Sequence, residues 1–161
     1  MRTGHSRGVS VLEIILVVAV LGIMLAVGFP RLVTPAARMY ANDVKAQLEQ
    51  ARYEAIKRNA PVAVVYDADA DRFETRLHPT DTSVTVTCTG STVLLARDAS
   101  EYRGVVVDEA ASTWSGAVVW LPSGQGRACN GSPSIGGDIV ITDGRTTRTV
   151  ELTVGGRVSI R

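Results

Sequence analysis

Residues 9–29 read VSVLEIILVVAVLGIMLAVGF, an apolar run of 21 residues that two glycines, one serine and one glutamate interrupt. As a helix rising about 1.5 Å per residue, the run would be about 31 Å long, enough to cross the hydrocarbon core of a bilayer. The preceding residues 1–8 contain two arginines and no acid, a bias that favours a cytoplasmic N-terminus. The run therefore predicts a single membrane-spanning helix. A secretory signal peptide cut near Ala26-Val27-Gly28 and a plain uncleaved anchor are the alternatives.

The composition of the whole chain is that of one small globular domain attached to this run. Of its 161 residues, 45% are hydrophobic and 20% are charged, which excludes an intrinsically disordered chain and a multi-span transporter. The 17 basic residues are almost balanced by 16 acidic ones, giving a net charge of +1. Proteins that bind nucleic acid through bulk charge carry a larger basic excess.

Glu13 is the one charged residue inside the apolar run. A carboxylate at the centre of a membrane span costs on the order of 2.5–3.5 kcal/mol, and less near an end, so it normally has a partner. The run contains no Lys, Arg or His, but cleavage between Gly8 and Val9 would create an α-ammonium group four residues before Glu13. We therefore expect Glu13 to pair with a new amino terminus, in its own chain or in a neighbouring subunit, and so to set the register of assembly.

The motif Gly8-Val9-Ser10-Val11-Leu12-Glu13 and the long apolar run after it resemble the class III signal of type IV pilins and type II secretion pseudopilins. This resemblance implies that a prepilin peptidase cuts after Gly8 and methylates Val9, where the family more often has Phe. Gly22 and Pro30 lie where major pilins have a helix-loosening Gly and Pro.

The segment 30–60 continues with the pattern of an amphipathic helix. From Ala36 to Arg58, one apolar stripe recurs at intervals of three and four residues. Its members are Ala37, Tyr40, Ala41, Val44, Leu48, Ala51 and Ala55. Asn59 and Pro61 then end the helix. With the apolar run, this segment predicts one long helix of about 50 residues, its first half in the membrane and its second half packed on a domain.

The segment 61–161 has the pattern of antiparallel strands. Short runs rich in Val and Thr alternate apolar with polar residues, which is typical of strands with one buried face. The expected strands are Val62–Tyr66, Arg72–Leu77, Val84–Cys88, Thr92–Ala96, Val105–Asp108, Ala117–Leu121, Asp138–Thr142, Thr147–Val154 and Arg157–Ile160. Asp143-Gly144 and Gly155-Gly156 predict hairpin turns, whereas residues 122–137 predict an irregular stretch. The fold class is therefore α+β, a long N-terminal helix packed on one or two antiparallel sheets.

Three further motifs resemble the GspH/FimT family of minor pseudopilins. They are the helix end Ala51–Arg58 before a Val-rich strand, the turn Trp120-Leu121-Pro122-Ser123-Gly124, and the terminal Gly156-Arg157-Val158. The resemblance implies a pilin-like fold with two β-sheets. It also implies partners: other pilins or pseudopilins, the prepilin peptidase, an inner-membrane assembly platform with its motor, and secreted cargo.

These observations divide the chain into a cleaved leader peptide (1–8), a transmembrane and filament-core helix (9–29), an exposed amphipathic half of the helix (30–60) and an extracytoplasmic β-rich domain (61–161). The predicted function is that of a minor pilin-like subunit, or pseudopilin, of a type II secretion system or type IV filament. We expect it in the inner (cytoplasmic) membrane with the N-terminus in the cytoplasm, and then in the filament. A minor pilin of the FimT kind that aids DNA uptake and a membrane-anchored binding module remain alternatives.

The remaining motifs favour structural roles. Asp67-x-Asp69-x-Asp71 lacks the Gly and Glu that an EF-hand loop requires at its sixth and twelfth positions, so an acidic turn between strands is favoured over a looser calcium site. Cys88 and Cys129 are the only cysteines, and outside the cytoplasm such a pair favours a disulfide over two free thiols. With two histidines and no phosphate loop, the sequence predicts no enzyme, no cofactor and no metal site.

Four arginines near the C-terminus raise a separate question about DNA. Residues 144–161 contain one acid, Glu151, and four arginines: Arg145, Arg148, Arg157 and Arg161. If two strands pair through the turn at 155–156, some of these arginines share a face and could hold phosphates without base readout. The favoured alternative is an ordinary solvated edge strand, whose charges discourage aggregation.

Overall fold

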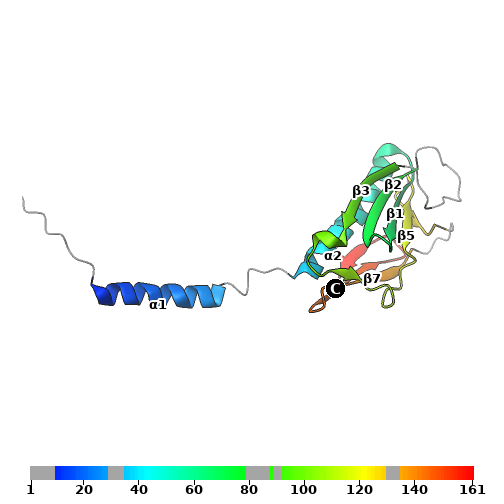
Figure 1. The fold of residues 1–161 in the computed structure, drawn as a ribbon. Coiled ribbons are helices and arrows are strands. Elements are labelled where there is room, and N and C mark those ends of the chain that lie inside the picture. Colours follow the sequence, from blue (N-terminus) through cyan, green and yellow to red (C-terminus); the bar gives the residue numbers. More distant parts are fainter. Residues whose placement is uncertain (1–9, 29–34, 79–87, 89–91, 130–134) are drawn as a thin grey trace, which may run out of the picture. The chain divides into compact units, whose positions relative to one another are not determined.

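The computed structural model describes residues 10–28, 35–78, 88, 92–129 and 135–161 (Figure 1). Contacts divide the chain into two units, Met1–Thr34 and Pro35–Arg161. Helix α1 (Val11–Gly28) belongs to the first unit. The second unit contains helix α2 (Ala36–Arg58), a short 3-10 helix η2 (Ala99–Glu101) and strands β1 to β9.

Helix α1 is apolar on all sides. Eleven large apolar side chains between Val11 and Met24 are 45% to 77% exposed, an arrangement that soluble helices with one buried face do not show. Within the described ranges, no helix is both long and apolar enough to cross a membrane. The span predicted over 9–29 extends past α1 at both ends, and the predicted continuity of one long helix depends on residues 29–34, which lie outside the described residues.

Helix α2 has the bounds that the apolar periodicity predicts. All seven residues of the predicted stripe are completely buried, and Gln47 is buried with them. The helix ends at Asn59, which adopts a left-handed conformation (φ 50°), a backbone geometry that Asn tolerates better than most residues and that often follows the last helical turn. Gln47 Nε2 donates to the Phe73 carbonyl oxygen and to Thr75 Oγ1, both at 3.0 Å, and so fixes α2 against a strand.

The strands form two antiparallel sheets (Figure 1). The larger sheet has the order β3-β2-β1-β5-β6 and contains β1 (Val62–Asp67), β2 (Arg72–Leu77), β3 (Thr92–Asp98), β5 (Ala117–Trp120) and β6 (Gly126–Arg127). The smaller sheet has the order β4-β7-β8-β9 and contains β4 (Val106–Val107), β7 (Gly137–Thr142), β8 (Thr147–Leu152) and β9 (Val158–Ile160).

One core joins α2 to both sheets. The stripe of α2 packs against Val62, Val64, Phe73, Val118 and Trp120 of the larger sheet and against Ile139, Ile141, Val150, Leu152 and Val158 of the smaller sheet. A second, smaller cluster covers the opposite face of the larger sheet around Ala63 and Val119, and Cys88 and Cys129 pack on it. The α+β class with two antiparallel sheets is therefore confirmed.

The strand predictions differ from the structure mainly at their ends and at one missed strand. Strand β8 ends at Leu152 and not at Val154, because the chain turns there into the hairpin that contains Gly156 (φ 79°). Strand β6 falls in the stretch predicted to be irregular, since two residues that include a glycine carry no periodicity. Residues 84–87 of the predicted strand Val84–Cys88 lie outside the described residues.

Candidate assembly site

Glu13 lies in the first turn of α1, and its side chain is exposed. The backbone N–H groups of Glu13 and Ile14 donate to the Ser10 carbonyl oxygen at 2.9 and 3.3 Å. Ser10 and Glu13 thus have the three-residue spacing of a capping box, and the helix N-terminus favours a carboxylate there. This local reason for an acid at position 13, which the sequence analysis missed, adds to the role expected in assembly.

The other residues expected in assembly are only partly described. Helix α1 continues without a break through Gly22, and a Cβ atom added there would meet nothing within 4 Å. Gly8, Val9 and Pro30 lie outside the described residues. The cleavage site, the methylated residue and the helix-loosening proline therefore stay predictions.

The N-terminus of α2 is held by a turn far away in the sequence. Pro35 precedes the helix and makes no side-chain cap, and its first turn contains no acid. Asp143, in the turn between β7 and β8, instead accepts a hydrogen bond from the Ala37 N–H at 3.3 Å. Its carboxylate also accepts hydrogen bonds from the backbone N–H groups of Thr146 and Arg145, at 2.7 and 3.0 Å.

These hydrogen bonds, first those from Thr146 and Arg145 and then that from Ala37, lower the pKa of Asp143 from 3.8 to about 2. Because the folded-state pKa is below its ordinary value, the stabilisation is complete above about pH 4 and is lost as the pH falls through 3.8 towards 2. Asp143→Asn should therefore lower the melting temperature at neutral pH and flatten its fall between pH 4 and 2.

Thermal unfolding of the full chain in detergent at stepped pH measures this effect. Glu101→Gln, which removes an exposed carboxylate from η2, controls for the change in net charge. If the melting temperatures of Asp143→Asn and Glu101→Gln fell in the same way between pH 4 and 2, the Asp143 hydrogen bonds would not couple α2 to the hairpin.

Asp67, the last residue of β1, and Asp69 and Asp71 after it form a tight turn, as the sequence predicted. Asp67 Oδ1 accepts hydrogen bonds from the Asp69 and Ala70 N–H groups at 3.2 and 3.3 Å, and Asp71 adopts a positive φ of 45°. Tyr66 donates its hydroxyl proton to Asp71 Oδ1 at 2.7 Å. Within the described ranges, no group of three or more His, Cys, Asp or Glu side chains is arranged to hold a metal ion.

Cys88 and Cys129 form a disulfide bond, with their Cα atoms 5.3 Å apart. The bond lies on the face of the larger sheet that α2 does not cover, where Ala63 and Val119 are almost completely buried. It therefore joins Cys88 to Cys129, which follows β6, on that face.

The four C-terminal arginines do not share one face. Arg157 and Arg161 alternate with the buried Val158 on β9 and so lie on one face, as pairing through the turn at 155–156 predicted. Arg148 pairs with the buried Ile141 and lies on the opposite face.

The positions of Arg145 and Arg161 also argue against a common strip. Arg145 lies in the turn between β7 and β8, and Arg161 forms an ion pair of 2.6 Å with Glu151. A phosphate-binding strip of all four arginines is therefore not assembled in this arrangement.

The sequence of this domain matches a known family model. The model for the type II transport protein GspH matches residues 40–156, more than two thirds of the chain. The chain belongs to the GspH family. No curated protein matches the sequence.

Solved structures show that this GspH-family chain has a pilin-like domain. The minor pseudopilin EpsH from the type II secretion system of Vibrio cholerae has a TM-score of 0.54 at 14% identity, over 78% of this chain and 95% of that one. The type IV minor pilin FimU of Pseudomonas aeruginosa has a TM-score of 0.56 at 15% identity, over 77% of this chain and 87% of that one. These likenesses establish the fold, and the family match favours a pseudopilin of type II secretion.

Proposed function

We propose that this GspH-family chain is a minor pseudopilin, a structural subunit of a type II secretion system. The match of residues 40–156 to the GspH family carries this proposal. The pilin-like fold fits a subunit of a filament, but it is shared with both EpsH and FimU and does not choose between them. The family match favours secretion over the pilus alternative.

The apolar helix supplies the means of assembly. Large apolar side chains exposed on all sides of α1 need to be covered, since contiguous apolar surface of this extent is rarely left in water. We propose that lipid of the inner membrane covers the segment 9–29 first, with the N-terminus in the cytoplasm, and that the helices of neighbouring pseudopilins cover it in the filament.

Glu13 gives this association its register. After cleavage at Gly8, the α-ammonium group of Val9 on one subunit pairs with the Glu13 carboxylate of another. A buried charge that loses its partner costs about 3–5 kcal/mol, so helices that slide out of register are disfavoured. The prepilin peptidase, the assembly platform and its motor are the partners that these steps require.

Processing at Gly8 is the first test of this function. The intact mass of protein isolated from membranes should correspond to the loss of residues 1–8 and the gain of one methyl group on Val9. Gly8→Leu should keep the leader attached, because a bulky side chain then replaces the glycine after which the peptidase is expected to cut. A mature chain that begins at Phe29 would instead identify a secretory signal peptide and contradict the proposal.

A further inference from the structure

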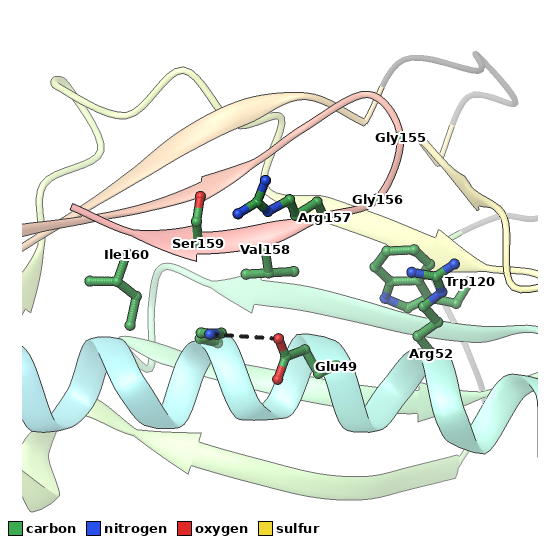
Figure 2. Close-up of a pocket in the computed structure, with 10 residues that line it drawn as sticks. Glu49, Arg52, Trp120, Gly155, Gly156, Arg157, Val158, Ser159 and Ile160 are labelled. Carbon is green, nitrogen blue, oxygen red and sulfur yellow. Dashed lines mark ion pairs between the residues drawn. The ribbon is translucent and has the colours of Figure 1, made fainter.

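A groove with a volume of about 740 Å³ lies between α2 and strand β9. Lys45, Glu49 and Arg52 of α2 line one side, and residues 155–160 line the other. Figure 2 shows that Val158 and Ile160 point towards α2, whereas Arg157 and Ser159 point away from it. The indole of Trp120 and the side chain of Arg52 close one end of the groove (Figure 2).

Strand β9 presents an unpaired edge to this groove. It is the last strand of its sheet, after β8. Arg161 exchanges two backbone hydrogen bonds with Thr149, and Arg157 accepts one from Thr153. In an antiparallel pair such residues alternate with residues whose N–H and C=O groups point outward. The backbone groups of Val158 and Ile160 therefore point to the free edge, where another strand could pair with them.

The closed end of the groove has an unused hydrogen-bond donor. Trp120 is completely buried, and its Nε1 has no hydrogen-bond partner among the described residues. A buried N–H group without an acceptor is costly, and most such groups in folded proteins are satisfied. The Arg52 guanidinium carbon lies 5.5 Å from the centre of the Trp120 ring. A carboxylate arriving at this end would meet the guanidinium group of Arg52, which lies over the buried indole ring.

The charge of the groove favours an acidic ligand. Its lining contains three basic residues, Lys45, Arg52 and Arg157, and one acid, Glu49. Glu49 is engaged by Lys45 in an ion pair of 3.8 Å. For the part of the chain that the structure describes, neither Arg52 nor Arg157 forms an ion pair. Arg52 offers its charge on the α2 side of the groove, whereas Arg157 points away from α2 and offers its charge on the other side of β9.

We propose that this groove binds an extended acidic segment of a neighbouring protein subunit, which pairs with β9 as an added strand. Main-chain hydrogen bonds to Val158 and Ile160 would hold the segment, as in other cases of strand addition. A carboxylate on its α2-facing side would select for acidic sequences through Arg52, which the Trp120 ring holds in place. The inference names a partner surface and rests on the proposed function, since a pseudopilin meets its partners in a filament.

A strand-forming peptide tests this directly. The probe is a capped, fluorescent seven-residue peptide, Thr-Glu-Val-Glu-Val-Glu-Thr, titrated into the full chain in detergent and followed by anisotropy. The same peptide with Lys in place of Glu should bind at least about tenfold more weakly, because its charges face those of the groove. No binding of the acidic peptide at concentrations up to about 1 mM would overturn the proposal.

Two N-methylated forms of the acidic peptide test strand pairing without any change to the protein. One is methylated on the backbone nitrogens of its glutamates, and the other on those of its valines. Only alternate N–H groups of an added strand point to β9, so one form should lose binding at least about tenfold and the other should keep it. The register of the peptide decides which of the two forms loses binding, because a shift by one residue exchanges the two faces of the peptide. Equal binding of both forms would exclude strand addition.

Two charge reversals locate the site. Arg52→Glu should weaken binding of the acidic peptide at least about tenfold and reduce the discrimination against the Lys peptide. Arg103→Glu, a matched change at an exposed position in the connection to β4, should leave both affinities unchanged. Equal effects of the two changes would show a general charge effect and overturn the assignment.

A second copy of the chain is the competing occupant. Self-association that increases with concentration and that the acidic peptide fails to displace would assign the edge to another copy and overturn the proposal. Peptide binding is measured without cleavage or filament assembly, so its failure leaves the pseudopilin function standing. A failure of processing at Gly8 would in turn leave the binding result unaffected.

Discussion

Replacing Glu13 with Val should abolish incorporation of the chain into filaments and leave its insertion into the membrane intact. The change removes a carboxylate from an apolar segment and therefore lowers the cost of insertion into the membrane. A charge at the centre of a span costs on the order of 2.5–3.5 kcal/mol, and a charge near an end, such as Glu13, costs less. In the filament it leaves the α-ammonium group of a neighbour without a partner. A loss of about 3–5 kcal/mol corresponds to a more than hundredfold loss of association.

Fractionation of membranes and crosslinking to neighbouring pseudopilins measure the two effects separately. Ile15→Val, a small apolar change on the same helix, is the matched control and should assemble normally. Glu13→Gln separates charge from shape, since it keeps the size of the side chain and should still fail to assemble. If the Glu13→Val variant crosslinked normally to its neighbours, the proposed pairing of Glu13 with a neighbouring amino terminus would be wrong.

Trp120→Ala should lower the free energy of unfolding by about 3–5 kcal/mol, the usual range for removing a large buried aromatic side chain. The Trp120 side chain is completely buried and belongs to the core that joins α2 to both sheets. Its removal leaves a cavity where β5, β6 and the turn after β8 meet, and it also removes the cation–π contact with Arg52.

Chemical unfolding of the full chain in detergent, with equal denaturant slopes for all variants, measures this loss. Trp120→Phe keeps most of the ring and removes the N–H group that has no acceptor among the described residues. The phenylalanine variant should therefore lose much less stability than the alanine variant. A change of under about 1 kcal/mol for Trp120→Ala would show that the site collapses around the smaller side chain.

What the sequence predicted well depends on contacts that are local in the chain. The stripe of α2 and its end at Asn59 follow from residues three and four positions apart and from one backbone conformation. The hairpin turns at Gly144 and Gly156 could be predicted because glycine readily adopts the positive φ angles that such turns require, here 77° and 79°.

What the sequence could not predict depends on distant partners. The acceptor for the Ala37 N–H group is Asp143, 106 residues away, and no local pattern connects the two. The alternation along β8 shows which residues share a face with Arg148, but it does not show which face of the sheet that is. The pairing of Arg148 with the buried Ile141 on β7 decides it. The order of the strands, and with it the groove beside β9, likewise appears only when both sheets are assembled.

The indole of Trp120 also limits which sequences can share this fold. A Cβ atom on Gly126 would lie 2.2 Å from Ile135 Cδ1 and 3.0 Å from the Trp120 ring, and one on Gly156 would lie 2.9 Å from the same ring. In relatives with a residue smaller than Trp at position 120, position 126 gains room on the side of the indole. A side chain at position 126 also requires a residue smaller than Ile at position 135. Position 156 should remain glycine in all of them, because its φ of 79° disfavours any side chain whatever the space. Substitutions at 120, 126 and 135 should therefore be correlated among relatives, while 156 stays invariant.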